Sequence, residues 1–469
     1  MNLIWFRQDL RIKDNHALIE AAKQGDILPI YILDDNNAGE NKLGAASRVW
    51  LHHALHDLNQ SLDGHLQCYQ GQPTTILQQL CQDKAITTVY WNRCYEPWRI
   101  DRDKKIKQTL LNQGISVKSF NASLLWEPWQ TLKKDNTPYK VFTPFYRRGC
   151  LNAIEPRIPS EEPKQLTFID NKQHKKAIEN LNLLPKTCWH TKIEQQWDIS
   201  QKGAENALIT FFEQGVQAYK AGRNFPGQQN TSRLSPYLHF GQISPNQVWY
   251  QSYNREQTGD LDTFRSELGW REFSYSLLYH FPQLPIQNLQ VKFDRFPWQW
   301  GGDKLTAWQQ GKTGYPIIDA GMRELWQTGF MHNRVRMIVG SFLVKNLLLH
   351  WQQGEAWFWD CLVDADLASN SASWQWIAGC GADAAPYFRI FNPVTQGEKF
   401  DKEGEYTRRY VPELKELPDK YLFKPWEAPE AVLEQAGIKL GESYPMPIVD
   451  LRESREQALE AFKTLKAIQ

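Results

Sequence analysis

Short apolar runs alternate with amphipathic segments over about the first 125 residues. The apolar runs have the length and the β-branched or aromatic content of buried strands, and they read LIWF, ILPIYIL, LQCYQG, ITTVYWN and SVKSFN. Segments with helical spacing separate them, and helices are expected over 16–22, 47–62, 74–81 and 101–112. Strands that alternate with helices in this way predict a doubly wound parallel sheet, an α/β fold.

The carboxyl ends of the predicted strands lack phosphate-binding glycines. In doubly wound sheets a nucleotide commonly binds at those ends, yet neither GxGxxG nor a P-loop follows any of the apolar runs. The sequence therefore argues against a dehydrogenase-type cofactor site. Glu96, in the segment NRCYEPW after the fourth run, is either a ligand contact at this edge or an ordinary solvated loop acid.

The pattern changes twice further along the chain. Residues 126–200 are Pro-rich and irregular, with polar runs such as DNKQHKK, and they predict a connector. From residue 201 the strand signals disappear, and AENALITFFEQGVQAY repeats apolar residues at helical spacing. We therefore predict an α/β domain over 1–125, a connector over 126–200 and an all-helical domain over 201–469.

Polar side chains lie on the predicted helices that include MHNRVRM and DADLASN. Asp366, Asn370 and Trp374 are four residues apart and are expected to share one helix stripe. Asn333 and Met337 form a second pair with the same spacing. A plain core helix would not carry polar side chains on such a stripe, because burying them without partners is costly.

Two explanations of these buried polar residues are open. An internal ion pair, such as Arg336 with Asp364, would give individual buried polar groups a partner within the protein. A polar ligand in a pocket would account for Asn333, Asn370 and the flat ring of Trp376 together.

Hydroxyls and a guanidinium precede the predicted helix in NTSRLSPYLHFG. Ser235 is a good N-cap and Pro236 a good first helical residue. These groups and the free N–H groups of a first helical turn make an anion site suited to phosphate. An ordinary capping turn with an exposed arginine is the alternative. The polar residues are Thr231, Ser232, Arg233 and Ser235, with Tyr219 and Arg223 upstream.

The run FRSELGWREF places an acid, a flat ring and a cation on one helix face. Glu267, Trp270 and Arg271 are related by the spacings i, i+3 and i+4. Such a trio suits a base-like ligand that is stacked on one side and hydrogen-bonded at its edge. A Glu–Arg surface pair beside a buried tryptophan is the alternative.

Composition narrows the class of protein. The 469 residues, 41% of them apolar, have a mean hydropathy of −0.58, and no apolar run approaches the roughly 20 residues of a membrane span. Arg7, Asp9 and Arg11 interrupt any signal-peptide core. The seven cysteines never form CxxC, which predicts reduced thiols, no structural zinc site and a cytoplasmic protein.

Charge and aromatic content leave the ligand class open. A net charge of +1 does not by itself indicate a nucleic-acid partner, although a local basic stripe is compatible with it. The 20 tryptophans suit a protein that stacks flat rings or moves electrons, and they equally suit ordinary packing.

Six motifs in collinear order resemble the DNA photolyase/cryptochrome family. They are WFRQDLRIKDNHAL, TSRLSPYLHFGQISP, WREF, GKTGYPIIDAGMREL, MHNRVRM and the block from DADLASNSASWQW to DAAPYFRIFNP. The resemblance spans essentially the whole chain and is greatest to the class I cyclobutane pyrimidine dimer photolyases. It implies an N-terminal α/β domain, a connector and a helical domain that holds a bent FAD.

The resemblance places the flavin among the polar residues identified above. Asp364 and Asp366 are expected near the isoalloxazine and adenine ends, with Arg336 paired to Asp364. Asn370 is expected opposite flavin N5, where plant cryptochromes typically carry Asp and animal ones Cys, so reduced FAD is the expected working form. The residues expected around the ribityl and diphosphate groups are Tyr219, Thr231, Ser232, Arg233, Leu234 and Ser235.

The resemblance also implies a lesion pocket. Glu267 is expected to face the edge of the damaged bases, with Trp270 and Trp376 as flat walls. Asn333 and Met337 complete the pocket, and because (6-4) photolyases carry a histidine-bearing motif at this place, a cyclobutane dimer is the expected substrate. The dimer must be flipped out of the duplex. The expected DNA contacts are Arg223, Trp270, Arg271, Asn333, Arg334 and Gln396.

The implied reaction is a light-driven carbon–carbon lyase reaction. An electron from excited reduced FAD opens the two C–C bonds of the dimer and then returns, so that neither a metal nor a nucleophile is needed. Trp374, Trp351 and Trp298 match the family's electron-transfer chain, in that order from the flavin to the surface.

The antenna site is matched only in part. Glu96 matches a pterin contact, but Pro285 and Ile286 stand where folate-binding relatives often carry Cys-Lys. Methenyltetrahydrofolate, a deazaflavin, another flavin and no antenna at all therefore remain open.

A cryptochrome-type blue-light photoreceptor that binds FAD without repair is the alternative function. The end of the chain at Gln469, with no long tail, and the intact repair-pocket residues favour the enzyme. We expect a monomer whose partner is UV-damaged DNA, without an obligate protein partner and without a membrane.

Overall fold

The structure is a computed structural model that describes residues 1–169, 178–384, 386–387 and 389–467. The polar run DNKQHKK lies outside these residues. The chain forms two compact units, each assembled from segments that are distant in sequence. Unit 1 contains Met1–Glu213, Ser232–Pro282 and Val363–Ala368, and unit 2 contains Gln214–Thr231, Gln283–Leu362 and Ser369–Gln469. The domain boundaries at residues 125 and 200 stay a prediction.

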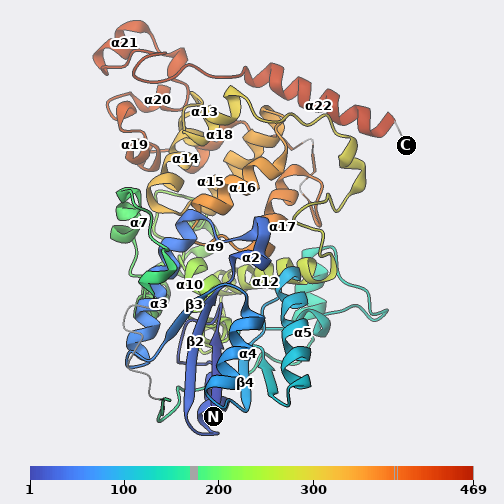
Figure 1. The fold of residues 1–469 in the computed structure, drawn as a ribbon. Helices are drawn as coiled ribbons and strands as arrows, with labels where there is room; N and C mark the ends of the chain where they lie inside the picture. Colours follow the sequence, from blue (N-terminus) through green and yellow to red (C-terminus); the bar gives the residue numbers. More distant parts are fainter. Residues whose placement is uncertain (170–177, 385, 388, 468–469) are drawn as a thin grey trace. The chain divides into compact units, whose positions relative to one another are not determined.

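A five-stranded parallel sheet forms part of unit 1 (Figure 1). Its strands are β1 (Asn2–Phe6), β2 (Ile27–Leu33), β3 (Gln67–Gln70), β4 (Thr88–Asn92) and β5 (Ser116–Phe120). They follow the order β3-β2-β1-β4-β5, and each neighbouring pair is parallel. The predicted doubly wound α/β fold is therefore confirmed.

The sheet is covered on both faces, which explains the continuous apolar runs of its central strands. All residues of β1 and β2 are buried. Alternate side chains of a strand point to one face, and Leu3, Trp5 and Ile30 share a core cluster with Leu77 and Ile106 from the following helices.

The helices of the α/β part of unit 1 are α1 (His16–Ala22), α2 (Asp35–Ala38), α3 (Ala45–Ser61), α4 (Pro73–Asp83) and α5 (Pro97–Asn112). Further along the chain come α6 (Phe142–Pro144), α7 (Thr191–Gln196), α8 (Gln201–Thr210), α10 (Ser235–Phe240), α11 (Pro245–Tyr253) and α12 (Gly259–His280). Four helices of unit 1, α1, α3, α4 and α5, agree with the predicted segments to within about a turn.

Ion pairs occupy the carboxyl edge of the sheet. Arg7 follows β1 directly and pairs with Asp103 of α5 at 2.5 Å, while Arg102 of α5 pairs with Asp34 at 3.0 Å. Both guanidinium groups are buried and both carboxylates lie beside them, so the charges are paired where water is excluded. This part of the WFRQDLR motif joins β1 to α5.

Unit 2 is helical, as the sequence predicts. Its helices are α9 (Tyr219–Gly222), α13 (Asp303–Gln309), α14 (Pro316–Thr328), α15 (Asn333–Ser341), α16 (Trp351–Cys361), α18 (Pro393–Phe400), α19 (Glu405–Tyr410), α20 (Asp419–Leu422), α21 (Glu430–Gln435) and α22 (Leu451–Ala467). Helix α17 (Leu367–Ala378) begins in the short segment of unit 1 and continues into unit 2. Among the described residues, all five strands belong to unit 1.

The motif GKTGYPIIDAGM forms a turn held by one buried carboxylate. Asp319 of α14 accepts hydrogen bonds from Thr313 N at 2.7 Å, Gly314 N at 3.1 Å and the hydroxyl of Tyr444 at 2.7 Å. These bonds tie the turn to both its own helix and the C-terminal part of the chain. Helix α14 begins directly after this turn, at Pro316.

Two details of the predicted helices are wrong. Helix α10 has Leu234 at its N-cap and Ser235 as its first residue, so Ser235 does not cap the helix and its hydroxyl instead donates to Asp364 at 2.6 Å. Asp366 precedes α17, because the chain enters the helix only at Leu367. Asn370 and Trp374 alone therefore share the predicted stripe.

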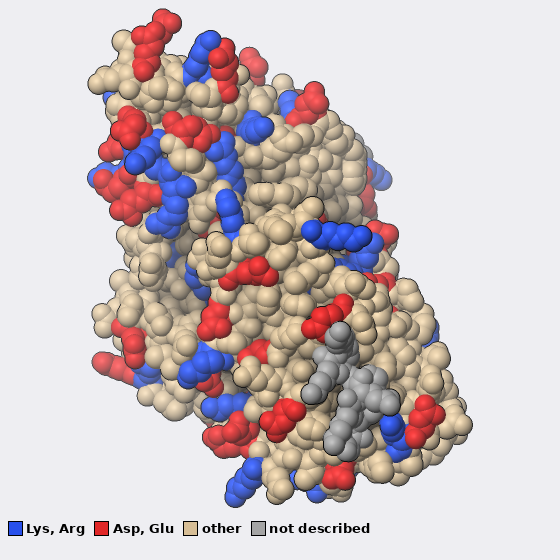
Figure 2. All heavy atoms as spheres, turned by 60° about the vertical axis from the view of Figure 1, so that its left-hand side comes forward, with Lys and Arg blue, Asp and Glu red and all other residues tan. Residues whose placement is uncertain are grey.

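Acidic and basic side chains are interspersed over the face drawn in Figure 2, as the net charge of +1 leads one to expect. Among the described residues no helix is long and apolar enough to cross a membrane.

Candidate functional site

Helix α12 carries the predicted acid, ring and cation. Trp270 stacks face to face on Phe142, with ring centroids 3.7 Å apart and planes inclined by 9°. Glu267 lies one turn earlier and is half-buried. The stack holds the plane of the indole, and the apolar run KVFTPFYRR contributes its ring to this face.

Arg271 does not extend into water from this helix. Its guanidinium is 14% exposed, pairs with Glu272 at 3.0 Å and lies over the ring of Tyr275 at 5.0 Å. Glu272 also accepts hydrogen bonds from Leu125 N and Trp126 N at 2.9 and 3.2 Å. Burial raises the pKa of Glu272 to about 7, although Arg271 and these N–H groups oppose the rise.

Sequence reasoning missed Glu272. It is the acid of the WREF motif itself, and its only further signal in the sequence is that it directly follows a basic residue on a helix. Its contacts to Leu125 and Trp126 are distant in sequence and show that it fastens the start of the predicted connector to α12.

The two aspartates expected near the flavin have different surroundings. Asp366 accepts hydrogen bonds from the hydroxyl of Tyr275 at 2.5 Å and from His239 Nδ1 at 3.4 Å. Burial alone would raise its pKa, but His239, Arg271 and Tyr275 outweigh burial and hold the pKa below its ordinary value. Asp366 is therefore a carboxylate at neutral pH.

Asp364 is bound to the segment expected around the diphosphate. Ser235, itself exposed, donates its hydroxyl hydrogen to Asp364. Arg233, two residues before it, has a positive φ of 52°, and its guanidinium lies over the ring of Trp197 at 4.1 Å. Thr231 and Ser232 are half-buried.

Helix α15 begins with an exposed asparagine. Asn333 is its first residue, and Met337 follows one turn later, half-buried. The predicted i,i+4 pair therefore lies on one helix. Arg336, on the same helix, donates from Nε to the carbonyl of Met331 at 2.7 Å and lies over the ring of Phe330. Its pairing with Asp364 stays a prediction.

Two of the arginines expected to contact DNA, Arg223 and Arg334, are held by neighbouring side chains of unit 2. Arg334 donates to Asn224 Oδ1 at 2.5 Å and lies over the ring of Phe400 at 4.4 Å. Arg223 lies over the ring of Tyr219 at 5.6 Å. The pKa of Arg334 is lowered, first by burial and then by the positive charge of Arg223, so an anion bound here would relieve repulsion between the two.

Asn370 is anchored through its amide nitrogen. Its Nδ2 donates to the backbone carbonyl of Glu355 at 3.0 Å, and this is the one side-chain hydrogen bond that it makes within the described residues. The carbonyl oxygen Oδ1 is therefore left as an acceptor. Helix α16, which carries Glu355, thus fixes the orientation of the residue expected opposite flavin N5.

Sequence reasoning also missed Glu355 itself. Its Oε1 accepts from the hydroxyl of Ser371 at 2.5 Å, next to Asn370 on α17. Burial raises the pKa of Glu355 to about 8, against the smaller opposing effect of Ser371. A neutral carboxylic acid therefore contacts the helix that carries Asn370. It lies four residues after Trp351 on α16, and in the sequence it resembles an ordinary solvated acid.

The three tryptophans of the predicted chain lie in unit 2. Trp374 is buried and packs so closely on α16 that a Cβ on Gly354 would lie 2.1 Å from its ring. Trp351, one turn before Gly354, is fully buried and donates from Nε1 to Asn288 at 2.9 Å. Trp298 is half-buried.

The ring of His350 bridges the outer two tryptophans. Its centroid lies 5.5 Å from that of Trp351 and 5.4 Å from that of Trp298. The structure therefore joins Trp351 and Trp298 through one aromatic ring and joins Trp374 to the helix that starts with Trp351.

The remaining predicted residues fall on other elements. Glu96 precedes α5, is buried, accepts from Gln8 at 2.8 Å and pairs with Arg99 at 3.3 Å. Gln396 lies half-buried on α18, and Trp376 lies half-buried on α17.

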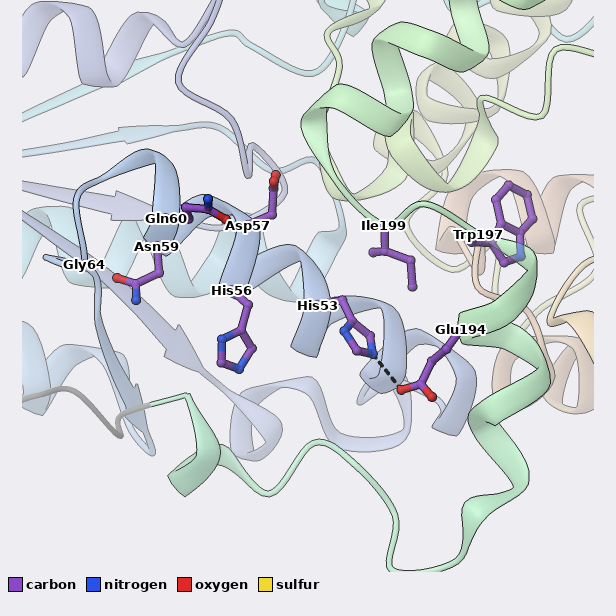
Figure 3. Close-up of a pocket in the computed structure, with 9 residues that line it drawn as sticks. All are labelled: His53, His56, Asp57, Asn59, Gln60, Gly64, Glu194, Trp197 and Ile199. Carbon is purple, nitrogen blue, oxygen red and sulfur yellow. Dashed lines mark hydrogen bonds and ion pairs between the residues drawn. The ribbon is translucent and has the colours of Figure 1, made fainter.

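One cavity of about 510 Å³ in unit 1 contains none of the predicted site residues. It lies between α3 and the segment of α7, and His53 Nε2 donates there to Glu194 Oε1 at 2.8 Å (Figure 3). Within the described part of the chain, no group of three or more His, Cys, Asp or Glu side chains is arranged to hold a metal ion.

Comparison with known proteins defines the class of protein. Residues 2–164 match the family described as DNA photolyase, and residues 264–464 match the FAD binding domain of DNA photolyase. The FAD prediction is therefore confirmed, and the chain is a flavoprotein.

Relatives along the whole length identify the family. A deoxyribodipyrimidine photo-lyase of Agrobacterium fabrum is 46% identical over 99% of this chain and 98% of that protein. Cryptochrome-2 of Arabidopsis thaliana is 37% identical over 100% of this chain and 79% of that protein. The chain belongs to the DNA photolyase/cryptochrome family, and the prediction of an enzyme of the photo-lyase type is confirmed.

One solved structure corrects the predicted subclass. The bacterial class III photolyase from Agrobacterium tumefaciens superimposes with a TM-score of 0.94, at 45% identity, over 99% of this chain and 98% of that one. The expectation that the chain is closest to class I is therefore not supported. The six motifs identified the family but not the class within it.

Proposed function

We propose that this enzyme uses light and reduced FAD to split cyclobutane pyrimidine dimers in UV-damaged DNA. The environment of Asn370 carries the proposal. With Nδ2 held by the carbonyl of Glu355, the Oδ1 atom is an acceptor for flavin N5–H, and an amide offers no acidic proton in return. This favours the reduced flavin that repair requires.

The residues present fit a flavin dinucleotide. Oδ1 of Asn370 is an unused acceptor within the described residues. Within unit 1, Ser235 and Asp364 form a hydroxyl–carboxylate pair. We assign the contacts with the isoalloxazine and adenine ends of FAD to Arg336, Asp364 and Asp366. The ribityl and diphosphate contacts are assigned to Tyr219, Thr231, Ser232, Arg233, Leu234 and Ser235.

When bound, reduced FAD supplies the photoexcited electron that opens the dimer. The chain's own side chains position the substrate. Trp270, kept in plane by Phe142, offers a flat wall, and Trp376 a second one. Glu267 forms hydrogen bonds with the edge of the flipped bases. A hydrogen-bonding group contributes most to the binding free energy where its partner is buried. Asn333 and Met337 complete the lining.

Phosphate contacts hold the DNA while the lesion leaves the duplex. We assign them to Arg223, Arg334 and Gln396, because the first two repel each other until an anion is present. Arg271 neutralises Glu272, so its predicted phosphate contact rests on the family resemblance alone. Trp270 and Asn333 also contact the DNA in this proposal.

We propose that electrons reach the flavin along Trp374, Trp351 and Trp298. The ring contacts through His350 and the close packing of Trp374 on Gly354 support this order. Glu96 is a candidate antenna contact. Its buried Oε2 makes no hydrogen bond within the described residues, which leaves one acceptor for a ligand.

The relatives bear on the subclass of this enzyme. The likeness to a class III photolyase supports that class for this chain. We also propose that the enzyme acts as a cytoplasmic monomer, with an α/β domain over 1–125, a connector over 126–200 and a catalytic domain over 201–469. A photoreceptor without repair is the second candidate, since cryptochromes are among the relatives; Asn rather than Asp at 370 favours repair.

Repair of a defined substrate tests the proposal. The reduced holoenzyme is illuminated with an oligonucleotide that carries one thymine dimer, and the remaining dimers are counted against a dark control. We expect loss of dimers only in the light. Dimers that stay intact while the flavin absorbs normally would instead assign the photoreceptor function.

A matched pair of variants tests the assignment of Glu267. Glu267→Ala should reduce repair by about tenfold or more while FAD stays bound, because the carboxyl faces the lesion in this proposal. Glu434→Ala, which alters an exposed acid on α21, is the control. A Glu267→Ala protein that is purified without FAD and repairs normally once FAD is restored would overturn the assignment.

A further inference from the structure

A cavity of about 610 Å³ opens within unit 2 at the outer end of the proposed tryptophan chain. Trp298, Trp300, His350 and Trp351 form part of its wall, and Asn288 and Asp294 form another part. This volume lies in the range of small-molecule sites, which is roughly 300–1,000 Å³. None of the flavin or lesion contacts proposed above lines it.

One wall of this cavity is an exposed aromatic shelf. Trp300 is 64% exposed and stacks on His350, with centroids 4.6 Å apart and planes inclined by 15°. Ile286 and Val291 line the same cavity and are 65% and 71% exposed. Three large apolar side chains exposed around one cavity are a costly surface for a monomer and indicate a ligand with a flat apolar face.

The other walls present hydrogen-bonding groups with fixed roles. His350 Nδ1 accepts from Gln352 N at 3.2 Å, and burial lowers the pKa of His350 to about 4, so the neutral ring carries its hydrogen on Nε2. Asn288 donates to Asp294 at 2.6 Å and accepts from Trp351. The exposed carboxylate of Asp294 and the imidazole N–H thus offer an acceptor and a donor around the shelf.

We propose that this cavity binds a flat, conjugated dihydropyridine with an amide edge, of the reduced nicotinamide kind, which donates an electron to oxidised Trp298. The inference rests on the proposed chain Trp374, Trp351 and Trp298. Stacking on Trp300 and hydrogen bonds to the polar walls hold the donor ring next to the Trp298 indole, where electron transfer does not depend on a chance collision.

The proposed reaction transfers one electron and releases one proton. After light has withdrawn an electron from Trp298 through Trp351, the indole is a radical cation and serves as the oxidant. One electron passes to it from the bound ring. The indole returns to its neutral closed-shell form, and the oxidised donor releases one proton to the solvent around Asp294 and leaves as a neutral radical.

Binding in the dark is the first test, with 1-methyl-1,4-dihydronicotinamide as the probe. Equilibrium dialysis against the holoenzyme should show saturable binding. Trp300→Ala should weaken it about 5- to 150-fold, the range expected for loss of one aromatic stack. Trp326→Ala, which alters another tryptophan that is 58% exposed and does not line the cavity, should bind as the wild type does.

A flash experiment is the second test. The decay rate of the tryptophan radical should saturate with the probe in the wild type and rise linearly with ascorbate, an anion that has neither the dihydropyridine ring nor the amide edge. In Trp300→Ala the dependence on the probe should become linear too. Trp298→Phe should remove the long-lived radical.

The outcomes distinguish failure of the proposed ligand site from failure of the proposed tryptophan chain. No binding in the dark, or equal binding by Trp300→Ala, overturns the ligand site whatever the chain does. Binding without saturation of the radical decay overturns the role as donor. An unchanged radical signal in Trp298→Phe overturns the proposed chain and, with it, the role as donor, while binding in the dark reports on the cavity alone.

Discussion

Replacing Glu355 by Gln should remove a pH-dependent loss of stability from unit 2. The carboxyl of Glu355 is buried, and its pKa is raised from 4.5 to about 8 because burial disfavours the charged form. Among the described residues, Ser371 is its hydrogen-bond partner and no cation pairs with it. Deprotonation therefore leaves an uncompensated charge in the fold.

The sign and size follow from the two pKa values. Since the folded-state pKa lies above the unfolded one, the full stability is present below pH 4.5 and is lost as the pH rises to about 8. At about 1.4 kcal/mol per pKa unit, the loss is about 3 kcal/mol at pH 7 and about 5 kcal/mol above pH 8. Gln keeps an oxygen acceptor for Ser371 but cannot ionise.

Urea unfolding followed by tryptophan fluorescence at pH values from 5 to 9 measures the effect. The difference in unfolding free energy between Glu355→Gln and the wild type cancels the titration of all other groups. It should rise by several kcal/mol in favour of Gln across this range, whereas Glu460→Gln, at an exposed acid of α22, should give a flat difference. A flat difference for Glu355→Gln as well would refute the reasoning.

Three further substitutions probe the same structure. Gly354→Ala should destabilise unit 2 by about 1–3 kcal/mol in urea unfolding, because its Cβ would lie 2.1 Å from the Trp374 ring; unchanged stability would contradict that packing. Asp366→Asn should cost about 2–3 kcal/mol at pH 7. Since the pKa of Asp366 is depressed, its contribution is present at neutral pH and lost as the pH falls below the ordinary carboxyl range, so the wild type and the variant should converge in acid. Asn370→Asp should retain FAD by absorbance and lose tenfold or more in repair per photon, and full repair would contradict the proposed role.

Local patterns in the sequence predicted the α/β part of the fold. Because strand burial and helix spacing are properties of neighbouring residues, the alternation gave all five strands and the helices α1, α3, α4 and α5 to within about a turn, but not the short α2. The two local errors concern helix starts. Ser235 was expected to cap α10, but a hydrogen bond to Asp364, distant in sequence, takes its hydroxyl instead.

The motifs were informative about the family and silent about the class within it. Asn333, Asn370 and the tryptophans could be placed by register on their helices. Glu272 and Glu355 were missed, because what makes them unusual is burial beside groups more than ten residues away, and an acid on a helix resembles a solvated one in sequence.

The sequence by itself determined the order of strands and helices, the family and the set of polar residues that a flavin needs. Only the tertiary structure decided which neighbouring groups orient those residues. Phe142 fixes the plane of Trp270, the Glu355 carbonyl turns the amide of Asn370, and His350 links Trp351 with Trp298. The physical reason is that hydrogen-bond partners, burial and the resulting pKa values depend on contacts between distant segments, which no local pattern encodes.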